Sequence, residues 1–198
     1  MEKDFEEIVY SENVVGFNAL IVEYINMLDN TVMVSQKDFF NKMHRLLPLI
    51  YLKAIILPET EPIMPEMIEK SVTHEEWDAV HLTLSNKIGT YDSYNEVFEP
   101  LAENEDQMSS LAEGFTDIFQ DLKDYISLYN MGTPEIMNDA IWECKRNFAE
   151  FWGQRLVNIQ RVLHHLLYGG VNLLEDDALT DDDFDLDKRI KKDLDQEN

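Results

Sequence analysis

The 198-residue chain has one cysteine, Cys144, and few glycines and prolines, seven and six respectively. A single cysteine excludes an internal disulfide framework and a zinc site built from cysteines. Basic residues are also scarce, because 16 lysines and arginines stand against 40 acidic residues and the formal net charge is −24. A nucleic-acid backbone attracts basic surfaces, so this charge argues against direct nucleic-acid binding.

Long apolar runs are missing as well. The longest apolar stretch, 46–57, contains Pro48 and Lys53 and falls short of the roughly 20 residues that a membrane-spanning helix needs. The first seven residues include four acids and one lysine, whereas a signal peptide begins with basic residues. We therefore expect a cytoplasmic protein with no membrane partner.

Helix signals recur along the chain, while the alternating pattern of a strand does not. Helix N-caps are predicted at Ser35, Thr73, Asn104 and Thr133, the last of them followed by Pro134. Gly89 and Gly132 are expected to end helices. The pattern predicts an all-α fold, an antiparallel bundle of five to six main helices with one long helix near residues 134–168 and no sheet.

The chain divides into two parts. Residues 1–170 are expected to form a single helical domain, in which the proline-rich segment 58–65 is a linker between helices. Residues 171–198 form an acidic tail with 11 acids and 4 bases, either disordered or a short helix. An isolated helix of this length is marginal in water, so we expect it to form only when it packs on the body or on a partner.

The predicted helix over 107–130 has two distinct faces. Its apolar stripe consists of Leu111, Phe115, Ile118, Leu122, Ile126 and Tyr129. Its opposite side carries Glu113, Asp117, Asp121 and Asp124. This acidic row is interpreted as a solvated face with something basic opposite part of it, and a divalent-cation site is the alternative.

One arginine lies on an apolar face of the predicted helix over 134–168. That face consists of Ile136, Ala140, Cys144, Phe148, Phe151, Ile159, Val162 and Leu166, with Arg155 near its centre. A guanidinium there needs a partner, which a structural ion pair or a bound anion can supply. Gly153 permits a close backbone approach or a kink.

No residue pattern points to a catalytic site, a metal site or a cofactor. His81 follows Asp78 by three residues, which is half of a carboxylate-bridged di-iron pattern, but no other helix supplies the second half. We interpret His81 as a satisfied core residue and Cys144 as core packing. Motifs for nucleophilic catalysis, phosphate binding and dinucleotide binding are missing from the sequence.

Several segments resemble a bacterial family, the domain-of-unknown-function family 5063. They are Asp117-Ile-Phe-Gln-Asp-Leu-Lys123, Ala140-Ile-Trp-Glu143 and Phe148-Ala-Glu-Phe-Trp-Gly153, with Tyr94–Pro100 before them. The chain departs from the family pattern at Phe151, often histidine, and at Cys144, often tryptophan. The resemblance implies an all-helical bacterial cytoplasmic protein and supplies no activity.

Three functions remain open. The first is a non-enzymatic interaction or regulatory module that binds a protein partner, with the acidic tail contributing. The second is a small-molecule or anion-binding protein, or an enzyme, with a pocket around Arg155. The third is an acidic nucleic-acid mimic. The candidate ligand or ion-pair neighbourhood comprises Arg155, Trp152, Gly153, Asp117, Asp121, Lys123 and His81.

Overall fold

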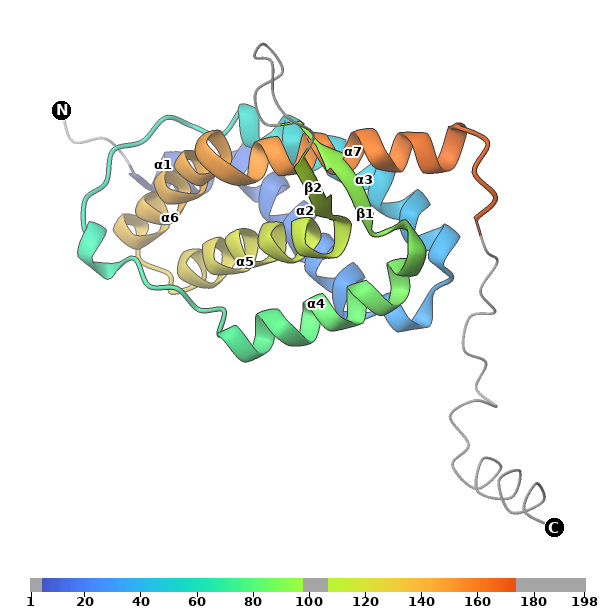
Figure 1. Ribbon diagram of the computed structural model, residues 1–198. Coiled ribbons are helices and arrows are strands. Elements are labelled where there is room, and N and C mark those ends of the chain that lie inside the picture. Colours follow the sequence, from blue (N-terminus) through green and yellow to red (C-terminus); the bar gives the residue numbers. More distant parts are fainter. Residues whose placement is uncertain (1–4, 98–106, 174–198) are drawn as a thin grey trace.

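The computed structural model describes residues 5–97 and 107–173, and most of these residues are helical (Figure 1). The α-helices are α1 (Phe5–Val9), α2 (Glu12–Asp29), α3 (Gln36–Ile55), α4 (His74–Ile88), α5 (Leu111–Tyr129), α6 (Pro134–Asn147) and α7 (Gly153–Tyr168). Helix α5 packs against α2, α4, α6 and α7, and the predicted stripe from Leu111 to Tyr129 is buried between them. The prediction of an all-α fold is confirmed.

Three of the predicted N-caps, Ser35, Thr73 and Thr133, begin their helices as expected. The Ser35 hydroxyl accepts a hydrogen bond from the Asp38 amide at 3.1 Å, and the Thr73 hydroxyl accepts one from the Glu76 amide at 3.2 Å. Thr133 caps α6 in the same way. These side chains satisfy backbone N–H groups that the first turn of a helix leaves without a partner, which is why the helices begin there.

The prediction of no sheet was wrong at one place. Strands β1 (Ser93–Glu96) and β2 (Gln107–Ser110) form a small antiparallel sheet. The predicted helix start at Asn104 was also wrong, because Gln107 belongs to β2; Asn104 itself lies outside the described residues. Helix α5 begins at Leu111 instead, since the Ser110 hydroxyl accepts from the Glu113 amide and the Asp92 carboxylate from the Ala112 amide.

The long helix expected near residues 134–168 is interrupted. A π-helical turn, Phe148–Trp152, separates α6 from α7, which follow one another along the same side of the bundle (Figure 1). The wider turn shifts the phase of the side chains. Phe151, predicted on the apolar face, is therefore 57% exposed, while Trp152 is completely buried.

Residues 58–73, which we call the strap, cross α5 and α6 with a single 3₁₀ turn at Pro65–Met67. Both carboxylate oxygens of Asp139 accept strap amides, from Ile63 at 2.7 Å and Met64 at 2.6 Å. Asp124 accepts from the amides of Ser71 at 2.7 Å and Val72 at 2.9 Å. The proline-rich linker is thus fixed to the bundle by buried carboxylates.

The described chain ends at Leu173, which packs with Val171 against the core. The rest of the predicted acidic tail, 174–198, lies outside the described residues. Within the part of the chain that the structure describes, no helix is both long enough and apolar enough to cross a membrane.

Candidate functional site

The acidic row of α5 is not the solvated face that its spacing suggested. Asp124 is only 5% exposed, and Asp117 and Asp121 are partly buried; Glu113 alone lies in solvent. The three inner carboxylates each have a partner from another element, which the pattern on α5 itself could not show. The expectation that something basic lies opposite the row is met by Arg155 and Lys70.

Arg155 of α7 forms an ion pair with Asp117 of α5. The second carboxylate oxygen of Asp117 accepts a hydrogen bond from the Trp77 indole of α4, with 3.0 Å between Nε1 and Oδ1. Asp117 therefore joins α4, α5 and α7 at one point. Asp117 is thus the partner that the sequence predicted for Arg155 without identifying it.

A surface hollow of about 420 Å³ adjoins this junction. Its walls come from the end of the strap, from α4 and from α5: Val72, Thr73, His74, Trp77, Asp117 and Gln120. Arg155 does not line the hollow, and its guanidinium is engaged by Asp117. His81 stacks on Trp77 with 4.9 Å between the ring centroids and so belongs to the same cluster.

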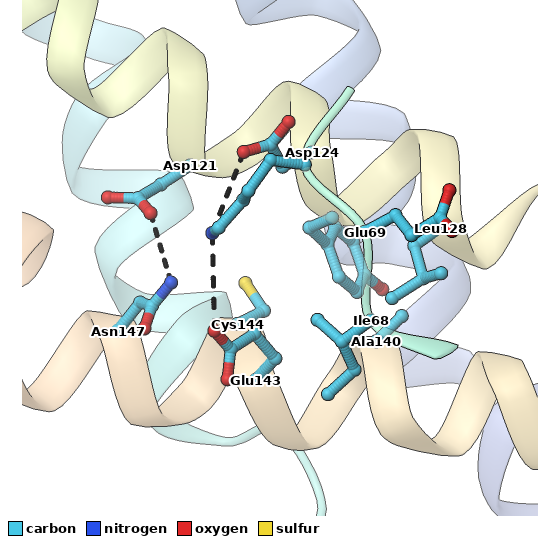
Figure 2. Close-up of a pocket in the computed structure, with 11 residues that line it drawn as sticks. Ile68, Glu69, Asp121, Asp124, Leu128, Ala140, Glu143, Cys144 and Asn147 are labelled. Atoms are coloured by element: carbon cyan, nitrogen blue, oxygen red, sulfur yellow. Dashed lines mark hydrogen bonds and ion pairs between the residues drawn. The ribbon is translucent and has the colours of Figure 1, made fainter. Parts of the chain in front are cut away.

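A second charged cluster lies between the strap, α5 and α6 (Figure 2). The Lys70 ammonium lies 3.6 Å from an Asp124 oxygen and 4.0 Å from a Glu143 oxygen. Asp121 accepts a hydrogen bond from the Asn147 amide, with 3.0 Å between Nδ2 and Oδ1. The cavity among these residues measures about 10 Å³, room for about one water molecule, so the cluster closes the interface and leaves no ligand pocket.

Burial raises the pKa of the Asp121 carboxyl to about 6. The Lys70 charge and the Asn147 hydrogen bond favour the ionised form, but both effects are smaller than the loss of hydration. The folded protein therefore holds a proton on Asp121 at pH values where the unfolded chain has released it. The contribution of Asp121 to the free energy of unfolding therefore falls as the pH rises from about 4 to 6, and it stays low above that range.

Replacing Asp121 with asparagine is expected to stabilise the protein at pH 7 by about 1–2 kcal/mol and to leave its stability at pH 3.5 nearly unchanged. Asparagine keeps the side-chain shape and the hydrogen bond to Asn147 but cannot ionise. Urea unfolding of both proteins at a series of pH values measures the difference. A gain that is equal at every pH would show that the ionisation of Asp121 is not its cause.

The structure separates most of the other residues in the predicted neighbourhood. The Trp152 indole donates to the Cys144 carbonyl at 3.3 Å inside the core, and Gly153 is buried against Phe148. Lys123 forms an ion pair with Glu76. Asp117 and Arg155 thus meet, and His81 joins them through Trp77.

Sequence reasoning missed Trp77 and Gln120, which line the hollow, and Lys70 and Asn147, which serve the second cluster. Trp77 was detectable in part, because it lies four residues before His81 and so on the same side of the predicted helix. Lys70 lies in the strap, which is not helical at this point, so a helical periodicity in the sequence could not predict which side chains Lys70 contacts. Within residues 5–97 and 107–173, no three His, Cys, Asp or Glu side chains gather in a way that could hold a metal ion.

A row of exposed apolar residues that the sequence did not reveal lies on the outside of α3. Leu49, Leu52 and Ile56 are 50%, 56% and 43% exposed. With Lys42 and Arg45 they follow one another at steps of three, four, three and four residues, so they share one side of the helix. We call these five residues the α3 stripe.

The α3 stripe is basic at one end and apolar at the other. Lys42 and Arg45 are exposed, and neither has a side-chain partner among the residues that the structure describes. They are unusual in a chain of net charge −24. The opposite side of the same segment, from Phe39 to Leu57, is buried in the core.

Comparison with known proteins supports the family resemblance. Residues 8–169 match the family described as a domain of unknown function, DUF5063. The crystal structure of protein BF1032 from Bacteroides fragilis is similar, with a TM-score of 0.74 and 32% sequence identity over 84% of this chain and 99% of that one. No curated protein matches the sequence. The chain belongs to the DUF5063 family.

Proposed function

We propose that this protein is a non-enzymatic interaction module of the bacterial cytoplasm, which binds an acidic amphipathic helix of a protein partner on the α3 stripe. The observation that carries the proposal is the exposure of Leu49, Leu52 and Ile56 in a row on a well-anchored helix. Single exposed apolar residues are ordinary on protein surfaces, whereas a contiguous row of them is typical of an interaction site.

The spacing of the stripe supports a helix as the binding partner. Alternating steps of three and four residues form the seam along which two helices pack in a coiled coil. An amphipathic helix with matching spacing would cover the row of apolar side chains from Leu49 to Ile56.

The charge of the stripe supports an acidic partner. Lys42 and Arg45 precede the apolar residues, so a helix with acidic residues at one end and apolar residues at the other complements both parts. The same charges disfavour a basic partner, which the rest of this acidic chain would otherwise attract.

Site-specific photo-crosslinking in the host cell tests this proposal. A photoreactive phenylalanine analogue replaces Leu52 in the full-length chain, and a matched variant carries it at Leu82, which is 63% exposed on α4. We expect position 52 to form an adduct that position 82 does not form, with an acidic amphipathic segment of another protein as the crosslinked peptide. Adding Lys42→Glu and Arg45→Glu should remove most of that adduct.

Two outcomes contradict the proposal. One is the same set of adducts from positions 52 and 82, which would mean that α3 has no preference for any partner. The other is an adduct at position 52 whose yield does not change when Lys42 and Arg45 are reversed in charge.

A further inference from the structure

The end of the described chain lies beside the start of α3. Leu173 lines a surface hollow of about 550 Å³ together with Lys37 and Asn41 of α3. The Tyr91 hydroxyl donates to the Asn172 carbonyl at 2.9 Å and fixes this end of the chain. The described chain thus ends beside Asn41, the residue before Lys42, where the α3 stripe begins, and 25 residues, 174–198, follow in the sequence.

The sequence of this C-terminal segment complements the stripe. Two blocks of acids, Glu175–Asp177 and Asp181–Asp183, precede Leu186, and the segment has a net charge of −7. Leu179, Leu186, Ile190 and Leu194 recur at steps of seven, four and four residues, a spacing that lines one side of a helix. In this segment the acidic blocks come before the apolar row of Leu186, Ile190 and Leu194. In the α3 stripe the basic residues likewise come before the apolar ones.

We propose that residues 174–198 occupy the α3 stripe of their own chain, as a helix parallel to α3. The triplet Asp181-Asp182-Asp183 would face Lys42 and Arg45, and the row from Leu186 to Leu194 would cover Leu49, Leu52 and Ile56. This inference rests on the proposed function, since it identifies the occupant of the same surface when no partner is bound.

The dimensions of the two elements agree. From Lys42 to Ile56, the C-cap of α3, the helix rises about 21 Å over 14 steps, and 179–194 would rise about 22 Å over 15 steps if helical. The five residues between Leu173 and Leu179 reach roughly 17 Å when extended, ample for a start beside Asn41. Tethering also gives the segment a high effective concentration at the stripe, so a helix that is marginal alone can dock.

Occupation by its own segment makes the stripe selective. An external helix must displace the segment, so only a partner that matches both the basic and the apolar end competes well. It also keeps the exposed leucines covered in the free protein.

Disulfide trapping in the full-length protein tests the inference. One variant carries Leu52→Cys and Ile190→Cys, and the matched control carries Leu82→Cys and Ile190→Cys. Cys144 stays in place in both, because it is buried and burial raises the pKa of its thiol well above the usual value, which makes it unreactive. Mild oxidation followed by non-reducing electrophoresis and peptide mass analysis measures the crosslink within one chain.

We expect the 52–190 pair to form the intramolecular disulfide at least roughly tenfold faster than the 82–190 pair. Adding Lys42→Glu and Arg45→Glu, or raising the salt concentration, should lower the 52–190 rate. Equal rates for both pairs overturn the inference, and so does a disulfide that forms only between two chains. Neither result affects the photo-crosslink to an external helix at position 52, so the two proposals fail separately.

Discussion

Replacing Asp124 with alanine is expected to lower the free energy of unfolding by about 3–4 kcal/mol. The Asp124 carboxylate accepts the amides of Ser71 and Val72 and the Ser71 hydroxyl, and its other oxygen faces the Lys70 ammonium at 3.6 Å. Alanine leaves the two strap amides without an acceptor and removes one of the two carboxylates beside Lys70. Equilibrium unfolding in urea measures the loss.

Asp78→Ala is the matched control for this prediction. Asp78 is an exposed carboxylate on α4 whose ion-pair partner is the exposed His74, so its removal should change the stability by less than about 0.5 kcal/mol. Asp124→Asn retains one acceptor oxygen and should lie between wild type and Asp124→Ala. If Asp124→Ala costs no more than Asp78→Ala, the strap does not depend on this carboxylate.

Replacing Gly153 with alanine is expected to cost about 2–3 kcal/mol, although alanine is the better helix former. A Cβ atom at this position would lie 2.4 Å from the Phe148 carbonyl oxygen and 2.9 Å from two atoms of the Phe148 ring. The backbone oxygen cannot move without deforming the π-helical turn, and the ring packs between Tyr51 and Trp152. Thermal unfolding should show a lower melting temperature.

Gly16→Ala in α2 separates this steric effect from helix propensity. A Cβ atom there would meet only the flexible end of Lys53, at 3.0 Å from Nζ, and that end can move. We therefore expect Gly16→Ala to be neutral or to stabilise by up to about 1 kcal/mol. A Gly153→Ala protein as stable as Gly16→Ala would mean that the π-helical turn relaxes without cost.

The sequence predicted those parts of the fold that depend on neighbours in the chain. The caps at Ser35, Thr73 and Thr133 are interactions over three residues, and the buried stripe of α5 follows from a helical period. The start of α5 was misplaced because two capping signals lie a few residues apart, and the choice between them was made by Asp92, nineteen residues before Leu111.

The candidate site was harder to predict than the fold, because its partners come from distant elements. A charge on an apolar face predicted that Arg155 has a partner, but not that the partner is Asp117, and Trp77 binds the same carboxylate from 40 residues away. Asp124 was predicted to be solvated, because the spacing of residues along α5 gives no information about the strap that covers it. The π-helical turn was invisible for a related reason, since a single wider turn changes which side chains face inward without changing the residue types.

The strap also bears on the order in which the molecule folds. Its amides lie 52 to 76 residues along the chain from the carboxylates that accept them, so closing these contacts early would cost much chain entropy. We therefore expect these contacts to form late in folding, after the helices that carry the carboxylates have packed. Contacts that form after the rate-limiting step govern how long the native state persists rather than how fast it is reached. We therefore expect the loss of Asp124 or Asp139 to speed unfolding, which shortens the lifetime of the folded protein, and to leave the rate of folding largely unchanged.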